Sequence, residues 1–412
     1  MCEQMQGSLQ GVTVCYVSTE AFGGLWRTWK QARTLRDAGA RIVIVGYQDL
    51  VPPKLREAPL ETVLVRSPHR DFADPAWLLW AALNRLPGRH QKQVPARVHG
   101  RVHLRRRHAP IVDAVASTGA DIVQAVDLTA LECAHEAARR IGAKLVYASH
   151  ELWDGFVQNP DAAIDPVLAA TLLEVERDLI SDASMVLATS DAMGQRLSEM
   201  YGIPRPLTIL NAPPQRVEVP RPVSWPVRFV FHGGLSRDRN VDGLIRAMEA
   251  LRGQATLDVY GYGRTTDAGV LQDLIDALDL GGSVTLHGRF AYEGVVELLS
   301  SYDVGVMANR ILEENFEVTL PNKVFDCMCA GLAIAMTGST AVRATLDEVP
   351  FGITVDPSSP ETIARDLGAL LQDPNRIMAM KRAAVAAAPR YWWPEQGRRL
   401  LEGMCELLRD DQ

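Results

Sequence analysis

Apolar runs typical of buried strands alternate with amphipathic helical patterns from the start of the chain. Val12–Val17 is a continuous run rich in β-branched residues, which is typical of a strand buried on both faces of a parallel sheet. Apolar residues then recur at helical spacing from position 25 to position 38, and Gly39 is a suitable end for that helix. A second strand is expected at Arg41–Val45. A strand, a helix and a strand in this order make a βαβ unit, which predicts a parallel sheet with right-handed crossovers.

The same alternation continues to residue 188 and begins again at residue 227. Further strands are expected at Ile122–Val123, Lys144–Ala148, Met185–Ala188, Val227–Phe231, Thr256–Tyr260, Ser283–Leu286 and Val304–Met307. Further helices are expected at Leu131–Arg140, Val241–Leu251 and Val270–Leu278. Between the two series, residues 211–226 are rich in proline, which suits a semi-rigid linker.

The pattern therefore predicts an α/β protein with two Rossmann-like, doubly wound domains that face a cleft. The expected bounds are 1–211 for the first domain, 212–226 for the linker and 227–388 for the second domain. A C-terminal helix is expected over 389–412, and it either packs across the domain interface or caps the second domain.

The composition narrows the class of protein. A chain of 412 residues with 47% hydrophobic and 23% charged residues is typical of globular domains, and a net charge of −7 argues against a nucleic-acid binder. The six cysteines are scattered and form no CxxC pair, which favours free thiols in a reducing compartment. No apolar run approaches the ~20 residues that span a bilayer, and the N-terminus has no signal-peptide pattern. We therefore expect a cytoplasmic protein.

The strongest chemical signal is the segment 231–247, where a strand ends, two glycines turn the chain and a helix begins. Gly233 and Gly234 would let a phosphate approach the backbone, and amides at a helix start attract anions. Arg237 and Arg239 add forked donors suited to phosphate oxygens. The alternative is a solvated surface loop.

Two other segments carry candidate binding groups. In Leu320–Gly331 a proline precedes a helix that ends at glycine, and Asp326 could accept hydrogen bonds from two ribose hydroxyls. The alternative role of Asp326 is to favour the helix dipole. His150 follows the strand that ends at Ala148, on the side that faces the cleft in such folds. His150 could bind a sugar hydroxyl there, or it could be a hydrogen-bonded structural histidine.

Together these segments resemble the GT-B glycosyltransferases, and most closely the retaining group called glycosyltransferase family 4. The resemblance spans nearly the whole chain in the right order. In the first domain it rests on Phe22-Gly23-Gly24, on Asp127 to Leu131 and on His150-Glu151-Leu152. Beyond that domain it rests on Asn211-Ala212-Pro213, on the basic residue Arg239, on Pro321 to Asp326 and on a terminal tryptophan, Trp392 or Trp393.

The resemblance implies that a sugar moves from a nucleotide-sugar donor, UDP- or GDP-linked, to an acceptor glycan or lipid-linked sugar, such as a cell-surface polysaccharide precursor. The first domain would serve the acceptor and the second domain the nucleotide sugar. A retaining reaction needs no protein nucleophile if Arg239, Arg237 and nearby amides stabilise the leaving diphosphate, which takes the acceptor's proton. His150 completes the catalytic set.

The donor-binding set that the resemblance implies comes from both domains. It consists of Gly23, Gly24, Gly233, Gly234, Gly261, Arg289, Thr319, Leu320, Asn322, Lys323 and Asp326. No Asp-x-Asp motif occurs in the sequence, so neither a metal nor another cofactor is expected.

Two departures from the family's pattern matter. The family has two glutamates eight positions apart. Here the second is shortened to Asp326 and the first position holds Val318, with Glu317 one residue away. In the family the first acid contacts the transferred sugar, and here the amides of Thr319 and Leu320 would contact the sugar or phosphate. The departures keep a catalytically silent subunit of the same fold as an alternative. A nucleotide-sugar epimerase is another alternative, and it would need carboxylates that act as acid and base.

A basic stretch in the first domain is unlike the rest of the chain. Residues 75–112 hold no acid but eight Lys or Arg and four His, and they include Trp77, Trp80 and Arg105–Arg107. Basic charge beside tryptophan is typical of an interfacial membrane patch or of a site for a polyanionic acceptor. The alternative is a buried helix followed by a solvated loop. The membrane interpretation places the protein at the inner face of the cell membrane.

Overall fold

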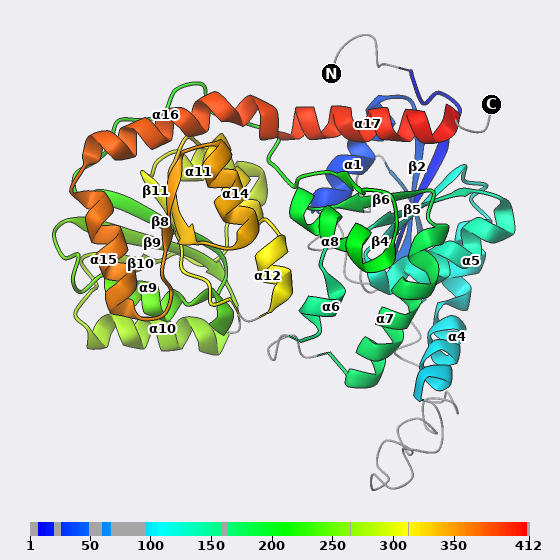
Figure 1. The fold of residues 1–412 in the computed structure, drawn as a ribbon, viewed down its shortest axis with the longest axis horizontal. Coiled ribbons are helices and arrows are strands. Elements are labelled where there is room, and N and C mark those ends of the chain that lie inside the picture. The colour runs from blue at the N-terminus through cyan, green and yellow to red at the C-terminus, as the bar shows by residue number, and fades with distance from the viewer. Residues whose placement is uncertain are drawn as a thin grey trace, which may run out of the picture. The chain divides into compact units, whose positions relative to one another are not determined.

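The computed structural model describes residues 7–19, 26–48, 60–66, 96–158, 164–263, 265–311 and 313–409, with the backbone alone at 96–99, 103, 262 and 265–267. The chain forms two compact units (Figure 1). The first unit comprises the chain up to Ile209 and again from Gly397, and the second comprises Leu210–Gln396. Each unit has its own parallel sheet, as the alternating pattern predicts.

The first unit is built on a seven-stranded sheet in the order β3-β2-β1-β4-β5-β6-β7. Its strands are β1 (Thr13–Ser18), β2 (Arg41–Tyr47), β3 (Glu61–Val65), β4 (Ile122–Val126), β5 (Lys144–Ala148), β6 (Met185–Ala188) and β7 (Leu207–Thr208). Its helices are α1 (Trp26–Asp37), α4 (Ala96–Ala116), α5 (Leu131–Ile141), α6 (Trp153–Phe156), α7 (Pro166–Leu179) and α8 (Asp191–Tyr201), with 3-10 turns η4 (Leu128–Ala130) and η5 (Ile180–Asp182). Strands β1 and β4 are buried along their whole length, as apolar strands in the middle of a parallel sheet should be.

The second unit is built on a six-stranded sheet in the order β10-β9-β8-β11-β12-β13. Its strands are β8 (Val227–Gly234), β9 (Ala255–Tyr262), β10 (Val284–Leu286), β11 (Val304–Met307), β12 (Ala333–Thr337) and β13 (Gly352–Val355). Its helices are α9 (Val241–Ala247), α10 (Thr265–Ala277), α11 (Val295–Leu299), α12 (Glu314–Val318), α13 (Asn322–Cys329), α14 (Thr340–Glu348), α15 (Pro360–Leu371) and α16 (Pro374–Tyr391), with turns η6 (Arg237–Arg239) and η7 (Tyr292–Gly294). In Figure 1 the strands lie between α9 and α10 on one side and α11 and α16 on the other. The last helix, α17 (Trp393–Arg409), begins in this unit and ends in the first.

The order of strands reverses beside the first strand of each sheet. β1 lies between β2 and β4, and β8 lies between β9 and β11. In open parallel sheets, ligands bind outside the carboxyl ends of the strands at such a point, because the connections to either side diverge there. In the second unit this point is flanked by the end of β8 with residues 235–240, and by residues 308–311 and 313–318 after β11. These segments carry several of the candidate residues.

Most of the predicted strands are confirmed. Lys144–Ala148, Met185–Ala188 and Val304–Met307 match the observed strands to the residue. The helix predicted over Val241–Leu251 is too long, because α9 ends at Ala247 and hydrogen-bonded turns follow it. Strands β3, β7, β12 and β13 were not predicted. β12 is rich in alanine and methionine, which favour strands little, but its position in the sheet buries every residue of it.

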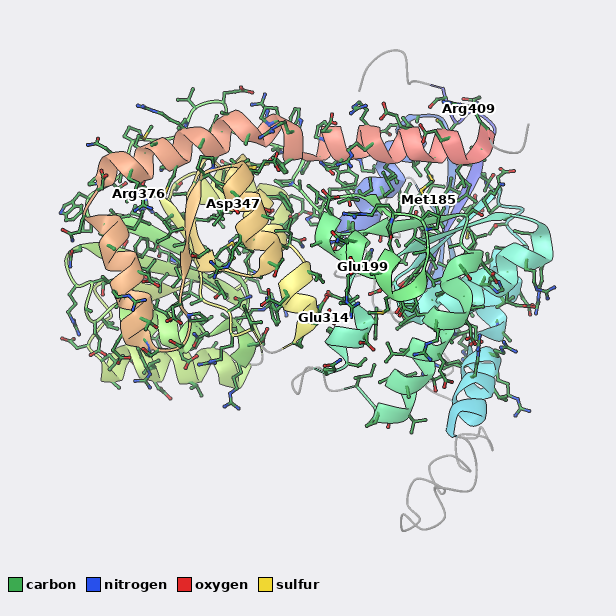
Figure 2. All side chains as sticks on the ribbon, in the orientation of Figure 1. Met185, Glu199, Glu314, Asp347, Arg376 and Arg409 are labelled. Atoms are coloured by element: carbon green, nitrogen blue, oxygen red, sulfur yellow. The ribbon has the colours of Figure 1, made fainter. Side chains whose placement is uncertain are left out.

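Close packing explains a glycine and a buried lysine. In the first unit, a methyl group at Gly403 of α17 would lie 2.6 Å from Leu207 Cδ2 and 3.6 Å from the Cε of Met185, which Figure 2 labels. In the second unit, Lys381 of α16 is 1% exposed and donates to Asp303 at 2.9 Å and to the Tyr302 carbonyl at 3.0 Å. The other oxygen of Asp303 accepts from the amides of Ser224 and Arg228. This buried ion pair therefore joins α16 to the start of β8.

Candidate active site

At the end of β8, the glycine turn leaves room for a ligand at one of its two glycines. Gly233 has a φ of +133°, a conformation that favours glycine, and a Cβ atom there would lie 2.5 Å from Lys323 Cε. A Cβ atom at Gly234 would have only Ser236 Oγ nearby, at 3.9 Å. Lys323 thus fills the space over Gly233, and Gly234 is where a ligand can approach the backbone.

Arg239 is held by neighbours from two segments. Its Nε lies 3.2 Å from Asp238 Oδ2, and its guanidinium lies 5.5 Å from the centre of the Phe316 ring on α12. Asp238 is buried, whereas Arg239 is partly exposed. Because both contacts limit the rotamers of Arg239, they keep a cation in a fixed direction after the glycine turn.

Arg237 contributes its backbone more than its side chain. The side chain is exposed, and the carbonyl accepts from Arg310 Nη1 at 2.7 Å. The amide of Arg310 donates to the Asp238 carbonyl at 2.8 Å, and its guanidinium lies 3.6 Å from Asp242. Arg310 therefore ties the η6 turn to the segment that follows β11.

The surroundings of Lys323 disfavour its charged form. Burial, and next the charge of Arg239, lower the pKa of Lys323 to about 7, although Asp326 acts in the opposite direction. An anion bound beside Lys323 would raise the pKa of this lysine, and the charged lysine would attract the anion. A diphosphate has the charge that this position lacks.

Asp326 does not face open space. It is 1% exposed, its Oδ1 accepts from Tyr292 Oη at 2.7 Å, and its Oδ2 lies 3.1 Å from His232 Nε2. Each oxygen can accept a further hydrogen bond, so the contact with ribose hydroxyls that the sequence suggests stays a prediction. The dipole role does not fit, because Asp326 lies beyond the first turn of α13.

Glu317, the acid next to Val318, is engaged by a neighbouring helix. Val318 ends the helix, and Glu317 Oε2 accepts from the amide and the hydroxyl of Thr340 at 2.8 and 2.9 Å, so Glu317 caps α14. The amide and the hydroxyl of Thr319 both donate to the Asn315 carbonyl, at 3.0 and 2.6 Å. This corrects the expectation for Thr319, because the amide that was to contact a sugar or phosphate already closes α12.

The remaining donor-binding candidates of the second unit divide into packed and exposed residues. A Cβ atom at Gly261 would lie 2.2 Å from Leu235 Cδ2, so the lack of a side chain at this glycine makes room for Leu235. The nucleotide contact expected for Gly261 stays a prediction. Leu320 packs against the core of the unit. Asn322, at the start of α13, and Arg289, after β10, are exposed.

In the first unit, His150 lines a small pocket at the carboxyl ends of β5 and β6. The lining residues are Arg27, Gln31, Ala148, Ser149, His150, Leu187, Ala188, Thr189 and Ile209. Burial, and next the charge of Arg27, lower the pKa of His150 well below its usual value. The ring is therefore neutral near pH 7 and has one donor and one acceptor for a hydroxyl group.

Asp127 fixes the backbone beside this pocket. Its φ of +65° is rare for a residue with a side chain. One carboxylate oxygen accepts from Leu128 N at 2.9 Å, from Trp153 Nε1 at 2.7 Å and from His150 N at 3.4 Å. Burial raises the pKa of Asp127, while the bonds from Trp153 and the backbone lower it. The carboxylate thus joins the end of β4 to the segment that carries His150.

Several predictions fall wholly or partly outside the described residues. Gly23 and Gly24 lie outside them, as do Trp77 and Trp80. The basic stretch is described from Ala96 onward, in α4, where Arg101 and Arg105 pair with Glu132 and Arg106 is exposed. Within the described ranges, no helix is long and apolar enough to cross a membrane, and no group of three or more His, Cys, Asp or Glu could hold a metal ion.

Two family models match the chain, one in each half. The model described as a glycosyl transferase 4-like domain matches residues 22–213, and the model described as glycosyl transferases group 1 matches residues 226–373. Together they cover the second sheet and all but the first strand of the first sheet. The chain belongs to the group 1 glycosyltransferases. No curated protein matches this glycosyltransferase in sequence.

Solved glycosyltransferases share the two-sheet GT-B fold of this glycosyltransferase. A glycosyltransferase from Rickettsia africae is 15% identical, with a TM-score of 0.69 over 96% of this chain and 98% of the other. HepE from Anabaena, in complex with UDP-glucose, is 16% identical, with a TM-score of 0.67 over 96% and 99%. WaaG, a glycosyltransferase involved in lipopolysaccharide biosynthesis, is 15% identical, with a TM-score of 0.62 over 96% and 99%. At this identity the likeness is one of fold.

Sequence reasoning missed several polar residues of this glycosyltransferase's site. His232 is the last side chain of β8 before the glycine turn, and that position at a strand's carboxyl end was an available signal. Tyr292 follows β10 and Arg310 follows β11, each by several residues. Only the fold brings Tyr292 to Asp326 and Arg310 to η6. No local pattern marks such residues.

Proposed function

We propose that this glycosyltransferase takes a sugar from a UDP- or GDP-linked donor and transfers it with retention of its anomeric configuration, without a metal ion. The observation that carries the proposal is the cluster at the end of β8. Gly234 leaves its backbone approachable, and Arg239 and Lys323 bring two cationic groups to the same turn. The cluster lies at the point where the strand order reverses, which suits a leaving diphosphate.

The proposed reaction breaks the bond between the anomeric carbon and the diphosphate oxygen and forms a bond from that carbon to an acceptor oxygen. The acceptor's proton goes to the departing diphosphate on the same face, so no protein base is required. Arg239 and Lys323 stabilise the charge that develops on the leaving group. One donor of this kind is worth ~2.7–4 kcal/mol in a transition state.

The donor class has support from a structural neighbour. HepE from Anabaena is solved with UDP-glucose, and its fold covers nearly all of this chain. In this glycosyltransferase the second unit would hold the nucleoside diphosphate, while His150 of the first unit would bind a hydroxyl of the sugar. Gly234, Arg237, Arg239, Leu320, Asn322, Lys323, Asp326 and Arg289 remain the proposed contacts or supports in the second unit.

The proposed acceptor is a glycan or a lipid-linked sugar, such as a precursor of a cell-surface polysaccharide. WaaG, which shares the fold, takes part in lipopolysaccharide biosynthesis. The basic stretch of the first unit would bring the protein to an anionic membrane. In the described part of that stretch Arg105 and Arg106 are exposed, and Glu132 pairs with Arg105 as well as with Arg101.

The experiment is a transfer assay with several activated sugars: UDP-glucose, UDP-galactose, UDP-N-acetylglucosamine and GDP-mannose. Free UDP or GDP is measured with and without a lipid-linked glycan acceptor, and the anomeric configuration of the product is read by NMR. We expect acceptor-dependent release, a retained configuration and no loss of rate in EDTA. An inverted product, or inactivation by EDTA, would refute the corresponding part of the proposal.

One observation favours a second candidate, a catalytically silent subunit. Glu317 is engaged in capping α14, so the position of Val318 has no acid to hold the transferred sugar. A silent subunit would bind the nucleotide sugar and release no diphosphate with any acceptor. Conversion of the donor sugar into an epimer, again without release, would indicate an epimerase instead.

A further inference from the structure

Glu176 of α7 is a buried acid that the proposed reaction does not use. It is 1% exposed, its Oε1 accepts from Tyr147 Oη of β5 at 2.7 Å, and its Oε2 accepts from Tyr201 Oη of α8 at 2.8 Å. Near Tyr201 lie the charges of Asp154 of α6 and Arg177 of α7. Because a hydroxyl group can either donate or accept a hydrogen bond, the two tyrosines suit a protonated carboxyl group as well as an ionised one.

Asp127, a second acid near Glu176, has partners of a different kind. It precedes η4, and α7, the helix of Glu176, packs against that turn. The Oδ1 of Asp127 accepts from the backbone amides of Leu128 and His150 and from the indole Nε1 of Trp153. These three N–H groups donate and cannot accept, so they favour the ionised form of Asp127.

The surrounding charges place a proton more readily on Glu176 than on Asp127. Burial, and next the charges of Asp127 and Asp154, raise the pKa of Glu176 to about 7, although the hydrogen bonds from its two tyrosines act in the opposite direction. Burial also raises the pKa of Asp127, but its three hydrogen bonds and the charge of Arg27 on α1 lower it.

Both acids act on the segment that follows β5. Tyr147, a partner of Glu176, lies on β5, and His150 follows the end of that strand by two residues. Asp127 holds the same segment at the His150 amide and, at the start of α6, at the Trp153 indole. Since two like charges close together disfavour each other, a proton on one acid lets the other stay ionised.

We propose that Glu176 is a positioning residue that carries a proton at neutral pH, so that Asp127 stays ionised and holds the segment of His150 and Trp153. When Glu176 loses this proton at higher pH, the second negative charge weakens that hold. The assignment concerns the first unit by itself, and it rests on the proposed function only in taking His150 as a contact of the sugar.

The first test needs no ligand and follows the proton directly. In protein labelled with ¹³C at the glutamate carboxyl groups, with the signal assigned through Glu176→Gln, we expect Glu176 to titrate with a midpoint of about pH 7. Asp127→Asn should lower this midpoint because a like charge is removed, and Tyr201→Phe should raise it because a donor to the ionised form is lost. Glu199→Gln, an exposed residue of α8 that Figure 2 labels, is the matched control and should leave the midpoint unchanged. A midpoint near the ordinary value of 4.5, or one that Asp127→Asn does not move, would overturn the proposal.

The hold on the segment is read at the indole N–H of Trp153, with its ¹⁵N signal assigned through Trp153→Phe. We expect this signal to shift between about pH 6 and about pH 8 with the midpoint of Glu176, and to stay constant in Glu176→Gln. A signal that does not change with pH in the wild-type protein would show that loss of the proton leaves the bond to Asp127 intact, against the proposal.

The second test uses two matched pairs of probes, UDP with UDP-glucose and GDP with GDP-mannose. At pH 8 about one tenth of the wild-type protein keeps a proton on a group with a pKa of about 7, so the affinity that the sugar adds to the nucleotide should fall about tenfold between pH 6 and pH 8. In Glu176→Gln this added affinity should stay constant, while UDP or GDP alone should show the same pH profile with both proteins, because Lys323 is unchanged. Added affinity with one pH dependence in both proteins would refute the positioning role. If the wild-type protein binds neither UDP nor GDP, the proposed function fails, while the carboxyl titration still decides whether Glu176 carries the proton.

Discussion

The depressed pKa of Lys323 predicts that nucleotide binding depends on pH in a way that this one side chain causes. With a pKa of about 7, Lys323 in the free protein is mostly charged at pH 6 and mostly neutral at pH 8. A bound diphosphate favours the charged form, so the pKa rises on binding and the protein takes up a proton above pH 7. Affinity for UDP or GDP should therefore fall as the pH rises from 7.

The magnitude follows from the pKa alone. At pH 8 about one tenth of the free protein carries the charged lysine, and charging the rest costs about 1.4 kcal/mol, a factor of about ten in Kd. At pH 6 the same cost is below about 0.1 kcal/mol. Calorimetry in two buffers of different ionisation enthalpy should report uptake of about 0.9 proton at pH 8 and about 0.1 at pH 6 from this group.

The matched control is Lys323→Arg. Arginine keeps its charge at every pH used, so this variant removes the lysine's titration while leaving a cation near the turn. Comparison of the two proteins also removes the effect of the ligand's own ionisation, because the terminal phosphate of UDP titrates equally with both. If the two proteins show the same pH profile and the same proton uptake, Lys323 is not the group that meets the diphosphate, and the reasoning is wrong.

Three further predictions test other parts of the molecule. Arg239→Ala should lower kcat by about 10²–10³-fold while the melting temperature stays unchanged, and near-normal turnover would remove Arg239 from the phosphate site. Lys381→Met should destabilise the second unit by about 3–5 kcal/mol in denaturant unfolding, because Asp303 is left buried without its cation, and Lys381→Met with Asp303→Asn should recover part of the loss. The basic stretch should carry the protein to the top of a flotation gradient with anionic but not neutral liposomes, more weakly in Arg106→Glu. Equal absence from both kinds of liposome, at low and moderate salt, would refute membrane contact.

The architecture was well predicted because strands and helices follow from hydrophobic periodicity, which involves only residues close together in the sequence. Strands such as Lys144–Ala148 are short apolar runs between clear turn signals, and their alternation with helices predicts a parallel sheet with right-handed crossovers. β12 was missed because its residues resemble a helix in composition, and only its place between β11 and β13 makes it a strand. The short strand Leu207–Thr208 carries no periodic signal at all.

The candidate site was predictable only where the chemistry is local. Gly234, Arg239 and Lys323 lie in motifs whose residue types indicate phosphate binding, and the fold brings them to one turn. The prediction for the Thr319 amide failed because the Asn315 carbonyl accepts its hydrogen bond, and the packing of Leu235 on Gly261 was not foreseen. A residue's type does not show which neighbour will contact it or share its hydrogen bond, because the packing of the fold determines that neighbour.

The division of α17 between the two units has a consequence for synthesis of the chain. The strands of the first sheet are complete when Thr208 has been made, but the residues that pack on Leu207 and Met185, around Gly403, are made only after the whole second unit. Folding that proceeds from the N-terminus during translation must therefore leave Leu207 and Met185 without their neighbours on α17 while Leu210–Gln396 emerges. The first unit begins to fold first and is the last to be completed.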